Sequence, residues 1–372
     1  MTTTTNNEHK KLNVPNLRFP EFQGEWEEYR IEDITENISS GRCKSRSSNG
    51  KYNLYGSTGI IGKTNEACYE GNLVLVARVG ANAGSLQILN EPCGITDNTL
   101  IIKPKAVDVQ YIYYFLQHFN LNRLIFGSGQ PLITGGMLKK VKVSLGTIQE
   151  QNKITRLLSI LDERISTQSK IIEDLKKLKS AIIEKLYKGI QGTWYSYRQL
   201  FSIINERNKQ LEYSNVLSAS QERGMVSRED LNLDIHFERS NISTYKIVKN
   251  GDYVIHLRSF QGGFAFSEKT GICSPAYTVL RSNNLLVYGY LSNYFTSRDF
   301  VKSLIIVTYG IRDGRSINVD EWLDMKVVIP SKEQQTHIVN VIESIENKIK
   351  NEETYSNCLL NQKQYLLRQM FI

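Results

Sequence analysis

Apolar side chains recur at steps of three and four residues along two stretches of the chain. The first stretch carries Ile154, Leu157, Leu161, Ile165, Ile172, Leu175, Ile182 and Leu186, with lysine and glutamate between them. The second carries Ile338, Val341, Ile345, Ile349, Leu359, Leu366 and Met370. This spacing is typical of a helix with a heptad seam, which needs a partner helix to cover it. Each predicted helix runs for about 38 residues, or roughly 57 Å.

The two seams repeat each other in register. Ile154 matches Ile338, and the separation of 184 positions then holds to the end of both helices. Each seam has a polar interruption, at Gln168 in the first helix and at Glu352 and Ser356 in the second. Burying one seam against the other is the simplest way to cover both, and the alternation of globular stretch and helix along the chain favours an antiparallel pair.

The rest of the chain has the short, mixed pattern of a globular protein. Strands are predicted at Leu73–Ala77, Thr99–Ile102, Tyr253–Ile255 and Thr278–Leu280, and aromatic helices near Tyr111–Phe119 and Tyr288–Phe295. We therefore predict an α+β fold, with two α/β domains joined by two long helices in an antiparallel coiled coil and a pseudo-twofold internal repeat. The predicted boundaries are 1–15 for a disordered tail, 16–148 for the first domain, 149–189 for the central helix, 190–330 for the second domain and 331–372 for the C-terminal helix.

Matching motifs in the two globular stretches support the duplication. The pattern G-x-W-x-x-Y-R occurs at Gly24, Trp26, Tyr29 and Arg30 and again, 168 positions later, at Gly192, Trp194, Tyr197 and Arg198. Further pairs are Gly59-Ile60-Ile61 with Gly224-Met225-Val226, and Gly71-Asn72-x-Val74-x-x-x-Arg78 with Gly251-Asp252-x-Val254-x-x-x-Arg258. Such a repeat indicates a target in two parts. Because the offset between the two copies changes in the loops, we expect the two domains to recognise different features and the target to be asymmetric.

Composition narrows the class of protein. The 372 residues carry a net charge of +8 and have a pI near 9.0, which suits a protein that meets phosphate backbones, although a mildly basic protein without a polyanion partner fits too. The five cysteines are far apart and form no C-x-x-C pair, so we expect reduced thiols in the cytoplasm. The five histidines are equally scattered, and no metal site is expected. The chain has no apolar run of 18 residues and no signal peptide, so no membrane association is expected.

One segment resembles a phosphate-binding loop. Residues 56–64 read G-S-T-G-I-I-G-K-T, but the glycine that such a loop requires five positions before its G-K pair is replaced by Ser57. The preceding residues 52–55 look like a poor buried strand, so we expect a turn that presents Lys63 and Thr64 to solvent. No methyltransferase Asn-Pro-Pro-aromatic loop, G-x-S-x-G elbow or H-E-x-x-H motif occurs. The chain is therefore expected to be non-catalytic.

Polar, basic and aromatic residues on the predicted loops remain as candidates for DNA binding. In the first domain they are Arg42, Lys44, Arg46, Lys51, Tyr55, Ser57, Thr58, Lys63, Arg78, Asn82 and Gln130. In the second they are Ser218, Ser220, Gln221, Arg223, His256, Arg258, Ser259, Gln261, Tyr309, Arg312 and Arg315. Arginine pairs with guanine, asparagine and glutamine with adenine, and lysine with phosphate. Arg78 and Arg258 stand out because each follows its strand at the same spacing, although a structural ion pair would explain that position too.

The chain resembles the specificity subunits of type I restriction-modification systems. The resemblance is carried by Leu17-Arg18-Phe19-Pro20-Glu21-Phe22 with Trp26, by Tyr55-Gly56-Ser57-Thr58-Gly59-Ile60-Ile61, by the Gly71 and Gly251 strands, by the helix openings Gln149-Glu150-Gln151 and Pro330-Ser331-Lys332-Glu333-Gln334-Gln335, and by the closing Lys363-Gln364-Tyr365-Leu366-Leu367-Arg368-Gln369-Met370-Phe371. It covers almost the whole chain. One departure is Gly146, where the second copy has Pro330.

The resemblance implies two target-recognition domains, each reading one half of a bipartite site on double-stranded DNA, with the helices setting the spacer between the halves. It also implies two methyltransferase subunits docked on the chain and up to two restriction subunits, the motor-nucleases. S-adenosylmethionine, ATP and Mg would belong to those partners, and this chain would bind no cofactor. The alternative is a coiled-coil scaffold whose globular domains bind protein instead of DNA.

Overall fold

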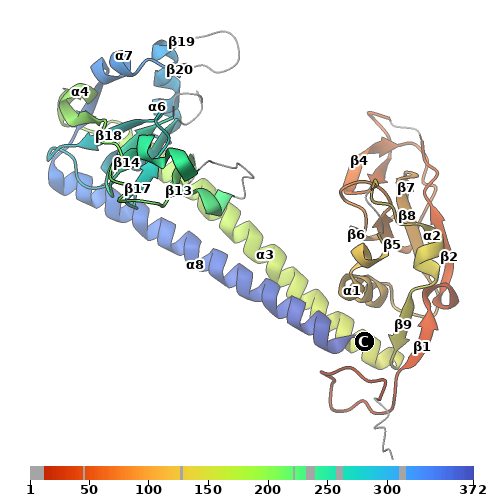
Figure 1. Cartoon of the computed structure of the whole chain (residues 1–372). Helices are drawn as coiled ribbons and strands as arrows, with labels where there is room; N and C mark the ends of the chain where they lie inside the picture. The colour runs from red at the N-terminus through yellow and green to blue at the C-terminus, as the bar shows by residue number, and fades with distance from the viewer. Residues whose placement is uncertain are drawn as a thin grey trace, which may run out of the picture. The chain divides into compact units, whose positions relative to one another are not determined.

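The computed structural model of the protein describes residues 12–44, 47–125, 129–220, 223–231, 239–256, 263–309 and 316–372 (Figure 1). The chain divides into two compact units. Unit 1 comprises Met1–Ser169 and Thr354–Ile372, and unit 2 comprises Lys170–Glu353. Each unit combines small β-sheets, short helices and parts of two long helices, so the predicted α+β class is confirmed.

Unit 1 is built around a four-stranded antiparallel sheet in the order β2-β8-β5-β6. Its strands are β2 (Thr35–Ser40), β8 (Thr99–Pro104), β5 (Asn72–Ala77) and β6 (Leu86–Asn90). A three-stranded sheet holds β4 (Gly59–Thr64), β3 (Tyr52–Gly56) and β7 (Cys93–Ile95), and a two-stranded one pairs β1 (Glu27–Arg30) with β9 (Lys142–Leu145). The short helices are η1 (Ile31–Ile34), α1 (Val109–Phe119), η2 (Leu121–Leu124) and α2 (Gly135–Lys139).

Unit 2 repeats this plan. Its four-stranded sheet has the order β11-β18-β15-β16, with β11 (Phe201–Ile204), β18 (Thr278–Ser282), β15 (Tyr253–Ile255) and β16 (Phe264–Phe266). The strand pairs are β10 (Thr193–Ser196) with β21 (Lys326–Ile329), β12 (Leu217–Ser220) with β13 (Gly224–Ser227), β14 (Lys246–Val248) with β17 (Gly271–Cys273), and β19 (Thr308–Tyr309) with β20 (Ser316–Ile317). Its short helices are α4 (Tyr197–Leu200), η3 (Arg228–Leu231), η4 (Arg239–Thr244), α5 (Tyr290–Tyr294), α6 (Arg298–Ser303), η5 (Leu304–Val307) and α7 (Val319–Asp324).

The two predicted long helices are α3 (Ile148–Tyr187) and α8 (Lys332–Met370). Within unit 2, Lys176 Nζ lies 2.7 Å from Glu353 Oε1, and Lys179 Nζ lies 2.6 Å from Glu346 Oε1. The partner's number falls as the number along α3 rises, so the two helices run antiparallel, as predicted. Within unit 1, an ion pair of 2.6 Å joins Lys363 on α8 to Asp162 on α3.

The apolar face of α3 is wider than the predicted seam. Leu158 and Ile183 are buried, whereas their neighbours Leu157 and Ile182, assigned to the seam from the sequence, are only half-buried. The reason is that α3 packs against a globular core as well as against α8, so its buried face must be broader than a coiled-coil seam. Gln168, the polar interruption, is itself buried.

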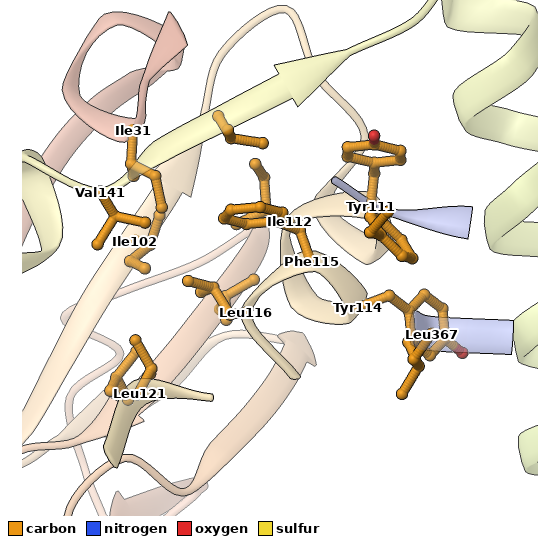
Figure 2. Close-up of a cluster of buried hydrophobic side chains, with 14 of the residues drawn as sticks. Ile31, Ile102, Tyr111, Ile112, Tyr114, Phe115, Leu116, Leu121, Val141 and Leu367 are labelled. Atoms are coloured by element: carbon orange, nitrogen blue, oxygen red, sulfur yellow. The ribbon is translucent and has the colours of Figure 1, made fainter. Parts of the chain in front are cut away.

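The last turn of α8 completes the core of unit 1. Helix α1 presents Tyr111, Ile112, Phe115 and Leu116 to this core, and Tyr114 lies beside Leu367 of α8 (Figure 2). The Phe371 ring lies 5.1 Å from the Tyr111 ring. Unit 1 therefore folds around segments from both ends of the chain.

The end of α3 fills the matching place in unit 2. Ile183 is buried in this core, and the Tyr187 ring lies 5.6 Å from the Tyr290 ring and 5.2 Å from the Tyr294 ring. Tyr187 and Phe371 are again 184 positions apart. The aromatic helix α5 is shorter than the predicted Tyr288–Phe295, because Gly289 before it adopts a left-handed φ of 72° that a helix cannot include.

The structure corrects the repeat at the start of each globular stretch. Glu27 pairs with Leu145, and Thr193 pairs with Ile329, so the two copies are offset by 166 positions here instead of 168. The tryptophans matched from the sequence are therefore not equivalent: Trp26 is 3% exposed and Trp194 is 65% exposed. The match of tryptophan and tyrosine in the two sequences is accidental, because Tyr29 and Tyr197 belong to different elements, β1 and α4.

A buried ion pair anchors the N-terminal segment to the start of α3. Glu150 is fully buried, and its carboxylate accepts hydrogen bonds from Arg18 Nε at 2.7 Å and Arg18 Nη2 at 2.9 Å. Trp26 Nε1 also donates to Glu150 Oε2, at 3.1 Å. A Cβ atom on Gly146 would lie 2.4 Å from Glu150 Oε2 and 2.6 Å from Trp26 Nε1, so this site requires glycine. The second copy has Pro330 at the position that matches Gly146. It does not require glycine there, because position 334, which matches Glu150, is an exposed glutamine.

The predicted disordered tail, residues 1–15, is too long at its C-terminal side. Asn13 Nδ2 donates to the Trp26 carbonyl oxygen at 2.6 Å, and the Trp26 amide donates to the Asn13 carbonyl oxygen at 2.8 Å. Residues 12–15 are therefore tied to the first unit by backbone and side-chain hydrogen bonds. Residues 1–11 lie outside the described part of the chain.

Candidate nucleic-acid interface

The segment that resembles a phosphate-binding loop is a β-hairpin. Residues 52–55, expected to be a poor buried strand, form most of β3, in which Leu54 and Tyr55 are buried. Thr64, expected to face solvent in a turn, is fully buried at the end of β4, and its hydroxyl lies 3.6 Å from Cys43 Sγ. The turn is formed instead by Ser57 and Thr58, since Gly56 pairs with Gly59. A phosphate-binding loop leads into a helix, and this segment does not.

Three of the predicted binding residues of unit 1 meet although they are far apart in sequence. The Gly80 amide donates to the Pro131 carbonyl oxygen at 3.0 Å, and the Ile133 amide donates to the Arg78 carbonyl oxygen at 2.9 Å. These bonds hold the loop of Arg78 and Asn82 against the segment of Gln130. We call the surface formed by residues 78–84 and 129–133 the loop edge.

The hairpin turn lies next to the loop edge. Gln87 Nε2, three residues after Gly84, donates to the Gly56 carbonyl oxygen at 3.0 Å. Ser57 and Thr58 therefore belong to the same part of unit 1 as Arg78, Asn82 and Gln130. Thr58, Asn82 and Gln130 are exposed and Ser57 is half-buried.

Hydrogen bonds fix the backbone of Arg78, whereas one nitrogen of its side chain has no such partner among the described residues. Its backbone amide donates to the Asn98 carbonyl oxygen at 2.9 Å, which fixes the main chain on both sides. Arg78 Nε is buried and has no hydrogen-bond partner within the residues that the structure describes. A structural ion pair, the alternative considered for this arginine, is not found in that part of the chain.

The other candidates of unit 1 lie at the opposite end of the hairpin. Lys51 precedes β3, with its Nζ 5.3 Å from the centre of the Tyr52 ring, and Lys63 Nζ donates to Asn53 Oδ1 at 2.7 Å. Tyr52 is four residues from Gly56, which is roughly 13 Å along a strand. Arg42 and Lys44 are exposed in the segment after β2, and Arg46 lies outside the described residues.

Tyr55 is occupied by an internal contact. Its hydroxyl donates to Glu91 Oε1 at 2.6 Å, and Asn53 Nδ2 donates to the same oxygen at 2.7 Å. Burial, with a further contribution from the Glu91 carboxylate, raises the pKa of the Tyr55 hydroxyl to about 12. The hydroxyl therefore stays protonated and stabilises the hairpin.

The candidates of unit 2 are only partly described. Ser218 and Ser220 lie on β12, and the backbone amide of the exposed Arg223 donates to Ser220 Oγ at 3.4 Å. His256 follows β15, with its ring edge-on to Tyr277 at 5.1 Å. Tyr309 ends β19, and only its backbone is described. Gln221, Arg258, Ser259, Gln261, Arg312 and Arg315 lie outside the described residues.

Another charged pair in unit 2 is structural. Asp252 is buried, and Arg281 donates to it through Nε and Nη2, both at 2.8 Å. The pair fixes the turn before β15, so Arg281 is not available for binding. Throughout the described ranges, no group of histidine, cysteine, aspartate and glutamate has the arrangement of a metal site, and no helix is long and apolar enough to cross a membrane.

Sequence reasoning missed an element that adjoins the loop edge, the 3-10 turn η2. A Cβ atom on Gly84 would lie 3.3 Å from Asn122 Oδ1 and 3.3 Å from Leu121 Cβ, so η2 packs against the loop that carries Arg78 and Asn82. The only sequence signal was a polar pair after the aromatic helix, which is too common to single out. Asn122 and Arg123 are both exposed.

Comparison with known proteins identifies this scaffold. Residues 23–177 match the family described as the type I restriction modification DNA specificity domain. Over 192 residues the chain is 30% identical to the type I restriction enzyme MjaVIII specificity subunit of Methanocaldococcus jannaschii, which covers 47% of this chain and 44% of the relative. Residues 23–177 therefore correspond to a type I restriction-modification DNA specificity domain. The resemblance found in the sequence is thereby confirmed.

Other specificity subunits are also similar to this chain. Over 278 residues the chain is 23% identical to the putative MjaX specificity subunit of the same organism, covering 68% of this chain and 65% of that one. The matches span less than two thirds of either relative's length. The solved S subunit of a type I restriction-modification system from M. genitalium has a TM-score of 0.59 at 15% identity and covers 96% of this chain and 99% of its own. At that identity the likeness shows the fold.

Proposed function

We propose that the protein reads a bipartite, asymmetric site on double-stranded DNA, one half with each unit, as the specificity subunit of a type I restriction-modification complex. The observation that carries this proposal is the loop edge, where the half-buried Arg78 and the exposed Asn82 and Gln130 are brought together from distant segments, in a chain whose residues 23–177 match a specificity domain. Arginine, asparagine and glutamine are the side chains that pair with base edges. Within the described residues, Arg78 makes no ion pair that would compete with DNA.

In this proposal the chain performs no chemistry. Two methyltransferase subunits dock on it and bring S-adenosylmethionine, and up to two motor-nuclease subunits bring the sites for ATP and Mg. The antiparallel pairing of α3 and α8 supports a role for the helices as the spacer between the half-sites. Part of each seam is buried and the rest is half-buried, and a packed helix pair of this kind resists bending.

The function is tested by binding of the full chain, with its methyltransferase partner, to a duplex containing the sequence that the host methylome assigns to it. We expect binding that is specific for this sequence and that falls steeply between 50 and 200 mM salt, because contacts to phosphates release counterions. A scaffold whose domains bind protein would show neither the sequence preference nor the salt dependence.

Arg78 is expected to contribute to the reading of one half-site. The variant Arg78→Ala should lose about 1–3 kcal/mol of discrimination at base pairs of one half-site and none at the other. The loss is measured by competition between duplexes with single base-pair changes. A matched control is Lys142→Ala on β9, which removes a positive charge from an exposed ion pair with Glu28 on β1. Equal losses in the two variants, or no loss in Arg78→Ala, would contradict the assignment.

The spacer role predicts the result of an insertion in α3. Adding four residues after Gln168 lengthens the helix by about 6 Å. We expect the methylated site to keep both half-sites and to change the number of base pairs between them, as measured by single-molecule sequencing of the host methylome. The same insertion after Gly189, where α3 has ended and φ is positive, is expected to change the spacer and keep the half-sites too. An altered half-site with an unchanged spacer would reject the hypothesis.

A further inference from the structure

The 3-10 turn η2 has a counterpart in unit 2 that differs in chemistry. Turn η2 begins one residue after α1 and η5 begins immediately after α6, and each turn exposes two consecutive residues next to a buried leucine. In η2, Leu121 is buried and Asn122 and Arg123 are exposed. In η5, Leu304 and Val307 are buried, and Ile305 and Ile306 are 58% and 72% exposed. The same element therefore presents a polar pair in unit 1 and an apolar pair in unit 2.

We propose that this turn is a further DNA-contacting element in each unit. In unit 1, Asn122 and Arg123 bind the first half-site. In unit 2, Ile305 and Ile306 contact thymine methyl groups of the second half-site. The inference rests on the proposed function and names residues that neither the sequence motifs nor the family assignment pointed to.

The position of η2 supports its part of the proposal. Asn122 packs beside Gly84, so η2 is continuous with the loop edge that holds Arg78, Asn82 and Gln130. Arg123 forms no ion pair with any carboxylate of the described residues, and its guanidinium remains available to a phosphate or a guanine. An arginine adjoining such an edge adds one more positive charge where the DNA backbone would pass.

The chemistry of η5 points to a base contact. Leu304 and Val307 anchor the turn in the core, so Ile305 and Ile306 are held outward on a fixed backbone. The turn leads directly into β19, which pairs with β20 through Thr308 and Ile317. Of the atoms that the major groove offers, the C5-methyl group of thymine is the apolar one, and aliphatic side chains recognise it. The lysine that precedes the turn, Lys302, is exposed and suits a neighbouring phosphate.

The test for η5 uses the complex of the full chain with its methyltransferase subunits and the duplex identified from the methylome. Uracil replaces thymine in one half-site at a time, which removes only the methyl group. We expect the wild-type Kd to rise about fourfold for each contacted methyl group, in one half-site only. In the double variant Ile305→Ser with Ile306→Ser, this sensitivity should disappear. Ile203→Ser, which changes an exposed isoleucine on β11, should keep it.

The test for η2 measures the salt dependence of binding. Arg123→Ala should reduce the slope of log K against log salt by about 1, because one phosphate contact is lost. Lys142→Ala should leave the slope unchanged. Thermal unfolding of every variant, followed by circular dichroism, shows whether the substitutions leave the fold intact, as exposed positions should.

The outcomes separate the two proposals. Absence of sequence-specific, salt-dependent binding by the wild-type complex would overturn the proposed function and this inference with it. Specific binding that is insensitive to uracil in both half-sites, or that stays equally sensitive in the isoleucine variant, would overturn the inference alone. So would a variant that loses its methyltransferase subunits while keeping its response to uracil, since η5 would then be a protein-docking surface. An unchanged salt slope in Arg123→Ala would remove η2 from the interface.

Discussion

Replacing Trp322 with alanine is expected to destabilise unit 2 by about 3–5 kcal/mol, the range found for large aromatic side chains removed from a packed core. Trp322 is fully buried on α7, and its ring stacks on Tyr197 with centroids 4.3 Å apart and an interplanar angle of 11°. It also lies 5.0 Å from the ring of Phe264. The cavity left behind cannot close easily, because rigid aromatic rings surround it on several sides.

Urea unfolding followed by circular dichroism measures this effect, with hydrogen exchange to assign it to unit 2. The control is Trp194→Ala, which removes the same side chain from β10, where it is 65% exposed. We expect that substitution to change stability by less than about 0.5 kcal/mol. Similar losses for the two tryptophans would mean that Trp194 is covered as Trp26 is, and would restore the offset of 168 suggested by the sequence.

Replacing Arg18 with alanine is expected to destabilise unit 1 by about 3 kcal/mol. The substitution leaves the Glu150 carboxylate, which is fully buried, with Trp26 as its remaining side-chain donor among the described residues. Removing one member of a buried ion pair is strongly destabilising because the other charge stays out of water. We place the value at the low end because the Arg18 side chain is 16% exposed and water can reach part of its site.

Trp26 fluorescence during urea unfolding reports this loss directly, since its indole donates to the same carboxylate. Lys153→Ala is the control, because it removes an ion pair with Glu21 between the same two segments, where both side chains are close to half exposed. That pair lies in water, and its removal should leave the urea midpoint nearly unchanged. If both variants lowered the midpoint equally, charge at the N-terminal segment would matter more than burial of Glu150.

The periodic parts of the chain were predictable because their spacing reflects a simple burial pattern. The strands β5, β8, β15 and β18 and the helix α1 are continuous apolar or aromatic runs, and the structure has them where the sequence predicts. The long helices follow from the heptad spacing. Strand β3 was missed because residues 52–55 mix polar and aromatic side chains, and their burial depends on pairing with β4 on one side and β7 on the other.

The binding residues were harder to predict because their proximity depends on long-range pairing. Arg78 and Gln130 are 52 positions apart and meet through backbone hydrogen bonds between residues 78–80 and 131–133. Lys63 and Tyr55 looked equally suitable in the sequence, yet Asn53 and Glu91 bind them in place. A list of polar loop residues cannot distinguish these two groups, because the difference lies in which partners the fold supplies.

The sequence by itself determined the duplication, the α+β class and the antiparallel helix pair, because repeated motifs and apolar periodicity can be recognised from the order of the residues alone. Only the tertiary structure decided the register of the first repeat, the burial of Thr64, the role of Glu150 and the membership of the loop edge. Each of these depends on atoms brought together from distant segments, and the distances and burial that decide them exist only after the chain has folded.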